Sequence, residues 1–171
     1  MSLTLAELNA ADRSVFTEEL GHLFEHSPWV AHETWPRRPF RDAAHLHAEL
    51  CATVRDAMPE RQLELIRAHP DLAGPLARGN RLTPESTREQ ASAGLDRMCV
   101  DDMGIFQEFN DAYRARFGFP FVICARHHDR LAIMGEMQAR LKETPEMEFA
   151  TALREIEKIA WLRLDDLLKK E

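Results

Sequence analysis

Lysine is scarce in this chain of 171 residues, which has a formal net charge of -7. The four lysines lie in charged segments near the end of the chain, at Lys142, Lys158, Lys169 and Lys170. A lysine that forms a Schiff base with a substrate is therefore poorly supported. The sequence also lacks a glycine-rich phosphate loop and a dinucleotide fingerprint. If the protein is an enzyme, we expect it to work without a cofactor.

Paired cysteines, basic character and long apolar runs are also missing. The three cysteines are an odd number without CxxC spacing, which favours reduced thiols over disulfides or a zinc site. No window approaches the ~20 consecutive apolar residues of a membrane span, and the first residues lack the pattern of a signal peptide. The acidic balance argues against binding to nucleic acid. These absences predict a cytoplasmic protein that binds neither nucleic acid nor a membrane.

Apolar residues recur at helical spacing through almost the whole chain, and proline and glycine interrupt them. The fold class we predict is all-α, a single-domain helical bundle over residues 1–171 with irregular loops and one short extended segment. Asn9 is the expected cap of the first helix. The predicted helices run from there to 27 and over 42–58, 60–68, 83–98, 101–117, 129–142 and 145–169, with an aromatic loop at 29–40 and the extended segment at 119–124.

His69 lies at a predicted rigid corner. Pro70 has no N–H and disfavours the α conformation of the residue before it, so the helix over 60–68 should end near His69. Histidine can give and take a proton near neutral pH because its unperturbed pKa is roughly 6.5. The plain alternative is a surface histidine in a turn.

Arg163 interrupts an apolar stripe on the last predicted helix. The stripe consists of Phe149, Leu153, Ile156 and Ala160, and the next position on it is Arg163. An inward guanidinium must be paired, because an unpaired buried charge is costly. Its planar fork suits two-point recognition of a carboxylate or urea group. The alternatives are an arginine that snorkels past the core edge and one that pairs with an internal acid.

Two further segments are candidates for binding. Ser86, Glu89, Gln90 and Ala93 share one side of a predicted helix, where small and polar side chains leave room for a ligand. The alternative is that this side faces water. The segment 118–125 has no strand partner, so loops, water or a ligand must satisfy its backbone N–H groups. Packing against helices is its alternative.

Four other histidines suggest a weaker alternative, a metal site. His22 and His26 are four residues apart, and His45 and His47 are two apart, spacings that can bind a metal. No third ligand stands at a recognisable spacing, so we predict no metal site. A metal-dependent hydrolase built on these histidines and a helical interaction module that uses the loop 29–40 are the alternative functions. Cys124 lies in an apolar run, where thiols are usually inert.

Five motifs follow one another along nearly the whole chain. They are SPWVA at 27–31, HPDLAG at 69–74, SxxEQxxAGL at 86–95, FGFPFVICAR at 117–126 and EIxKIxxLRL at 155–164. In sequence and in order, they resemble the motifs of the 2-oxo-4-hydroxy-4-carboxy-5-ureidoimidazoline (OHCU) decarboxylase family of urate breakdown. No motif position departs from the family pattern.

The resemblance implies a helical, cofactor-free, homodimeric enzyme. Its small-molecule substrate would be OHCU, which loses its 4-carboxylate as CO₂ to give (S)-allantoin. A urate oxidase and a hydroxyisourate hydrolase would be its neighbours in the pathway.

The resemblance also implies roles for single residues. His69 looks like the acid/base residue, Glu89 like the partner that orients the substrate or the imidazole, and Arg163 like the arginine that binds polar groups of the substrate. The other residues implied in substrate binding are Pro70, Ser86, Thr87, Arg88, Gln90, Phe121, Val122, Ile123, Cys124 and Ala125.

Overall fold

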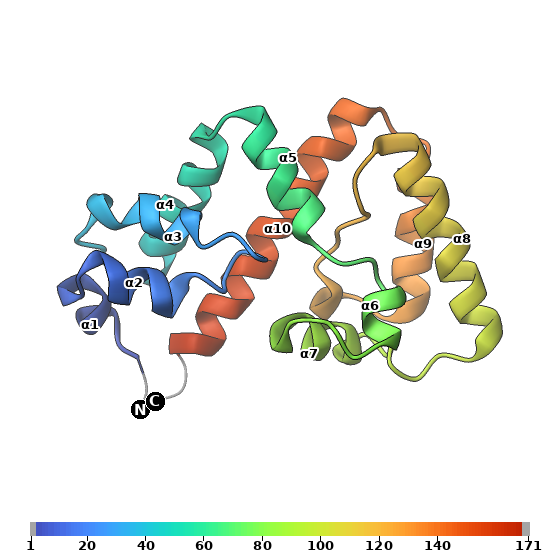
Figure 1. Ribbon diagram of the computed structural model, residues 1–171, viewed down its shortest axis with the longest axis horizontal. Helices are drawn as coiled ribbons and strands as arrows, with labels where there is room; N and C mark the ends of the chain where they lie inside the picture. Colours follow the sequence, from blue (N-terminus) through green and yellow to red (C-terminus); the bar gives the residue numbers. More distant parts are fainter. Residues whose placement is uncertain (1–2, 169–171) are drawn as a thin grey trace. The chain divides into compact units, whose positions relative to one another are not determined.

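The structure, a computed structural model, describes residues 3–168, and these contain helices and no strand (Figure 1). The predicted all-α fold class is confirmed. The helices are α1 (Leu5–Ala10), α2 (Arg13–Leu20), α3 (Trp29–Thr34), η1 (Trp35–Arg37), α4 (Ala43–Asp56), α5 (Pro59–Ala68), α6 (Pro75–Arg78), α7 (Pro84–Ser92), α8 (Val100–Phe117), η2 (Ala125–His127), α9 (Arg130–Arg140) and α10 (Pro145–Leu168). The helix predicted to reach Lys169 is described to Leu168, and Lys169 lies outside the described residues.

Contacts along the chain fall into two compact units. The first unit holds the residues up to Ala68 together with those from Glu157 onward, and the second unit holds His69–Ile156. Helix α10 contributes residues to both. The single domain over residues 1–171 stays a prediction.

The first unit begins with two short helices, and the helix predicted from Asn9 to residue 27 is wrong at both ends. Helix α1 lies mostly before that range, and α2 ends at Leu20. Asp12 caps α2 by accepting a hydrogen bond from the Val15 N–H, so the chain restarts there. Asn9, the predicted cap, lies inside α1. Its amide instead exchanges two hydrogen bonds with the Phe40 backbone, at 2.9 Å and 2.8 Å. The prediction was wrong because this asparagine binds a distant segment rather than its own helix end.

The aromatic loop predicted at 29–40 is largely helical. Pro28 is the cap of α3 and Pro36 lies in the first turn of η1. Both positions tolerate proline because the first N–H groups of a helix have no partner within it. The prediction of a loop was therefore wrong at 29–37.

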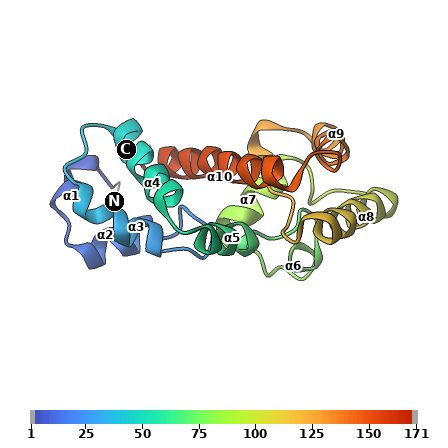
Figure 2. The ribbon, with the colours of Figure 1, turned by 90° about the horizontal axis from the view of Figure 1, so that it is seen from above.

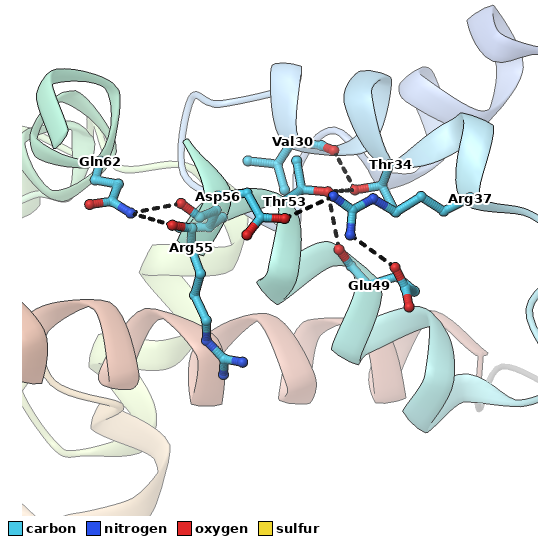
Figure 3. Close-up of polar contacts among 9 residues, drawn as sticks. Val30, Thr34, Arg37, Glu49, Thr53, Arg55, Asp56 and Gln62 are labelled. Carbon is cyan, nitrogen blue, oxygen red and sulfur yellow. Dashed lines mark hydrogen bonds and ion pairs between the residues drawn. The ribbon is translucent and has the colours of Figure 1, made fainter. Parts of the chain in front are cut away.

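Polar contacts tie α3 and η1 to α4 (Figure 3). The buried hydroxyls of Thr34 and Thr53 lie 2.7 Å apart. Arg37 donates to the carboxylates of Glu49 at 3.0 Å and Asp56 at 3.2 Å. In both ribbon views α2, α3 and α4 lie together, in agreement with their contacts (Figures 1 and 2). The helical segment after Pro28 is thus fixed on α4.

Helices of the second unit depart from prediction at two of their ends. Helix α7 was expected to reach Met98, but it ends at Ser92, and Gly94 has the left-handed φ of 78°. Helix α8 is capped by Cys99, whose sulfur accepts from the Asp102 N–H, and not by Asp101 or Asp102. The end of α8 at the left-handed Gly118 is as predicted.

The segment at 120–124 has neither helix nor strand, in line with the predicted connector. It is buried, and its Phe121 packs with the adjoining Phe119 against Tyr113 of α8. The Tyr113 ring meets those of Phe119 at 5.9 Å and Phe121 at 5.4 Å, both edge to face. None of the helices within 3–168 is long and apolar enough to cross a membrane.

Candidate functional site

His69 is the first residue after α5, which ends at Ala68 as predicted. Its side chain is buried, with 6% of its surface exposed. Pro70 follows and disfavours the α conformation of His69, so the helix ends before this histidine. His69 is therefore the first residue of the loop 69–74, and the backbone conformation of this loop determines where the imidazole lies.

Gln90 of α7 holds this loop by both ends of its amide. The Ala73 N–H donates to Gln90 Oε1 at 2.9 Å, and Gln90 Nε2 donates to the Asp71 carbonyl at 3.2 Å. Gln90 is buried. The sequence placed Gln90 among the substrate-binding residues. The structure shows its amide bound to the loop that begins at His69.

Two residues of α8 hold the same loop from another helix. Asn110 Nδ2 donates to the Leu72 carbonyl at 2.9 Å, and Arg114 Nε donates to the Asp71 carboxylate at 2.9 Å. Ala73 has a φ of 51°, which an L residue seldom adopts and which costs on the order of 1 kcal/mol. We call Gln90, Asn110 and Arg114 the loop clamp, because together they fix a strained backbone just after His69.

The contribution of the clamp can be measured residue by residue. Asn110→Ala is expected to lower the free energy of unfolding by about 1–3 kcal/mol, since it leaves a buried carbonyl of Leu72 without its donor. Arg114→Ala removes a half-exposed ion pair with Asp71 and is expected to cost less than about 1 kcal/mol. Urea denaturation of both variants gives the comparison. Equal losses would contradict a clamp centred on Asn110.

Helix α7 shows which of its predicted binding residues face inward. Ser86 is buried, Glu89 is partly buried, and Thr87 and Arg88 are exposed. Arg88 lies 3.7 Å from Glu85 with most of its side chain in solvent. The face that carries Ser86 and Gln90 is thus the inward face, and the alternative that it faces water is wrong. The binding roles of Thr87 and Arg88 stay predictions.

The second unit brings three predicted segments together. Gln90 joins α7 to the loop after His69, and α7 packs against η2, which begins at Ala125. The five residues 121–125 are all buried. The Phe121 ring packs in the aromatic core, so a ligand beside this segment would meet mainly its backbone. These segments supply a histidine, a helix face with Ser86 and Glu89, and backbone polar groups.

Arg163 lies in the first unit and pairs with an internal acid. Arg163 Nη2 donates to Glu25 Oε2 at 2.9 Å, and Nη1 donates to the His22 carbonyl at 3.1 Å. Both side chains are almost fully buried. The sequence left such a pairing open without naming Glu25. Its position two residues before the SPWVA motif is a sequence signal that could have pointed to Glu25. The role of Arg163 in substrate binding stays a prediction.

Two of the histidines in the metal alternative bind protein groups. His45 Nδ1 accepts from the Arg41 N–H at 3.1 Å, and His47 Nε2 lies 2.8 Å from the Glu157 carbonyl oxygen. Within residues 3–168, no three His, Cys, Asp or Glu side chains gather as they would around a metal ion. Burial raises the pKa of the neighbouring Cys51 thiol to about 12, which keeps it protonated.

Comparison with known proteins assigns the family. The profile of the OHCU decarboxylase family matches residues 9–165. The chain belongs to the OHCU decarboxylase family. It is therefore an enzyme of the carboxy-lyase type.

Similar proteins match this chain over nearly its whole length. An OHCU decarboxylase of Halalkalicoccus jeotgali is 43% identical over 165 residues, which cover 96% of this chain and 92% of that protein. The uric acid degradation bifunctional protein of Bacillus subtilis is 36% identical over 98% of this chain and 33% of its own length. A crystal structure of (S)-allantoin synthase superposes with a TM-score of 0.76 at 27% identity, over 97% of this chain and 54% of that one.

Proposed function

We propose that this chain decarboxylates OHCU to (S)-allantoin in urate degradation, with His69 as acid/base residue and stereoselective proton donor. Family membership supports the reaction. The observation that supports His69 is its place as a buried histidine at the start of a loop held by the clamp. A proton donor has to be held in one position if it is to serve one face of a ring.

The chemistry of OHCU explains why no cofactor is invoked. When the bond between C4 and the carboxylate breaks, its electron pair passes into the ring and is delocalised over the substrate's own imino and carbonyl groups. The 4-hydroxyl loses its proton and becomes the carbonyl of the product. A proton then joins the ring carbon that carries the ureido group. A second proton, taken from water, joins the former imino nitrogen, so the loss of CO₂ from the carboxylate is balanced by the net uptake of one proton. The protein has to position the substrate and move these protons.

His69 can serve both proton transfers. The imidazole accepts the proton of the hydroxyl as CO₂ departs, and the imidazolium then delivers a proton to one face of the ring. The face that receives it sets the handedness of allantoin. Glu89 lies one position before Gln90 of the loop clamp. Its role is to hold one tautomer of the imidazole or to orient the substrate. Arg163 binds polar groups of the substrate through its planar fork.

The same proposal includes the substrate cradle, the oligomeric state and the place of the enzyme in its pathway. We take the backbone of residues 121–125, with Pro70 and Ser86, as the cradle for the heterocycle. The enzyme acts as a homodimer in the cytoplasm, after a urate oxidase and a hydroxyisourate hydrolase. The similarity to a bifunctional uric acid degradation protein supports the place in urate breakdown.

Circular dichroism during urate breakdown tests this function. A urate oxidase and a hydroxyisourate hydrolase generate OHCU in place, and allantoin is followed with and without this protein in the presence of EDTA. We expect rapid formation of one enantiomer that EDTA does not affect. A slow racemic signal that the protein does not change would reject the proposal. Loss of activity in EDTA would favour the metal-dependent alternative.

A further inference from the structure

The second unit contains a buried polar cluster that the proposed mechanism does not use. It consists of Tyr113 on α8, Arg140 on α9 and Glu148 on α10. Arg140 Nε lies 2.9 Å and 3.2 Å from the two carboxylate oxygens of Glu148. The Tyr113 hydroxyl donates to Glu148 Oε2 at 2.5 Å. Burial, and next the hydrogen bond to Glu148, raise the pKa of Tyr113, so the hydroxyl stays protonated and donates.

Arg140 also reaches the segment proposed as the substrate cradle. Its Nη1 donates to the Val122 carbonyl at 2.9 Å, and its guanidinium carbon lies 4.2 Å from the centre of the Phe121 ring. One buried guanidinium thus holds two consecutive residues of the segment, one through the main chain and one through the ring. Its position is set in turn by the Glu148 carboxylate.

Stability alone explains this cluster poorly. Removing two charges from water costs about as much as their attraction returns, and apolar side chains of the same volume often stabilise a core as well. The arginine offers something that an apolar side chain cannot, a directed donor to the Val122 carbonyl. The segment has no strand or helix of its own to fix that carbonyl. The ion pair therefore supplies orientation where regular backbone hydrogen bonding is absent.

We propose that Arg140, oriented by Glu148, is a positioning residue that fixes residues 121–125 and thereby sets substrate affinity and the face of the ring that is protonated. This inference rests on the proposed function of that segment. Arg140 acts through the backbone of Val122 and takes no part in proton transfer. Its loss should therefore change KM and the purity of the product more than the rate of proton transfer.

Arg140→Lys separates positioning from charge. Lysine keeps a positive charge beside Glu148, but its point-like ammonium cannot reproduce the fork that spans Glu148 and the Val122 carbonyl. We expect kcat/KM to fall about 10- to 100-fold, mainly through a higher KM, because small displacements of a binding group have effects of this size. We also expect a measurable share of the other allantoin enantiomer. The assay is the same circular dichroism assay, run as a substrate series.

Tyr113→Phe is the matched control. It removes a hydrogen bond to Glu148 from the same cluster but leaves the contact between Arg140 and Val122 intact. We expect a lower melting temperature with KM and enantiomeric purity unchanged. If Arg140→Lys fails to fold, the double variant Arg140→Gln, Glu148→Gln replaces it, because it leaves no unpaired buried charge. Its KM and enantiomeric purity are then compared with those of Tyr113→Phe.

The outcomes distinguish this inference from the function on which it rests. An inactive native chain would reject the proposed function itself. An active native chain whose Arg140 variant keeps its KM and its single enantiomer would overturn the positioning role. Equal changes of KM in the Arg140 and Tyr113 variants would overturn it too, because the effect would then come from general packing. A higher KM with mixed enantiomers in the Arg140 variant alone would support it.

Discussion

Replacing His69 with asparagine is expected to lower kcat by about 10²–10⁴-fold, the usual contribution of a positioned acid/base group. Asparagine keeps a polar side chain at this position, and it is smaller than histidine. It cannot exchange a proton near neutral pH. The loop clamp holds residues 71–73 and is untouched by this change, so the variant should fold. Steady-state kinetics of allantoin formation give kcat, and circular dichroism gives the enantiomer.

His32→Asn provides the control for this variant. His32 is an exposed histidine on α3, in the first unit, so its replacement should leave kcat within about twofold. The informative comparison is between the two variants at equal folded fraction. A His69 variant that kept both the native rate and a single enantiomer would remove His69 from the mechanism.

Local chemistry explains which parts of the fold were predictable. Pro70 ends α5, Thr83 caps α7 before Pro84, and Gly118 ends α8, all as the sequence predicted. Each of these signals acts through the backbone of its own residue or of close neighbours. Such signals can be interpreted without knowing the tertiary structure.

The two wrongly predicted helix caps have different causes. Asn9 has the side chain of a good cap, but it binds Phe40, which is 31 residues away. Cys99 caps α8 through its sulfur, which accepts from the Asp102 N–H three residues later. At Asn9 a distant partner outweighs the average capping preference of the side chain, whereas at Cys99 the contact is local but the residue type is an uncommon cap. The sequence does not show which distant backbone group will lie within reach.

The same limit applies to the candidate site. The face of α7 with Ser86 and Gln90 was recognised because helical spacing is local. The clamp from Asn110 to Leu72 spans 38 residues, and the contact from Arg140 to Val122 spans 18. Neither residue breaks an apolar pattern strongly enough to be noticed. Arg163 did break such a pattern, but its partner Glu25 lies 138 residues away and was found only in the structure.

Arg163→Ala is expected to lower the free energy of unfolding by about 3–5 kcal/mol, the cost of breaking a buried ion pair by removing one partner. The Glu25 carboxylate would stay buried without the guanidinium that lies 2.9 Å from it. The His22 carbonyl would lose a donor as well. Urea denaturation measures the loss directly. A cost below about 1 kcal/mol would mean that water reaches Glu25 and that the pair is not a closed one.

Arg163→Lys distinguishes a structural arginine from one that also binds substrate. Lysine keeps a charge for Glu25, so most of the stability should return, but it cannot offer the two parallel N–H groups that suit a carboxylate or a urea group. If Arg163 binds substrate, kcat/KM falls in this stable variant while Glu25 stays paired. If kcat/KM is unchanged, the arginine serves the fold alone, and the polar groups of the substrate are bound by other residues. Stability and kinetics of this single variant therefore answer two separate questions about Arg163.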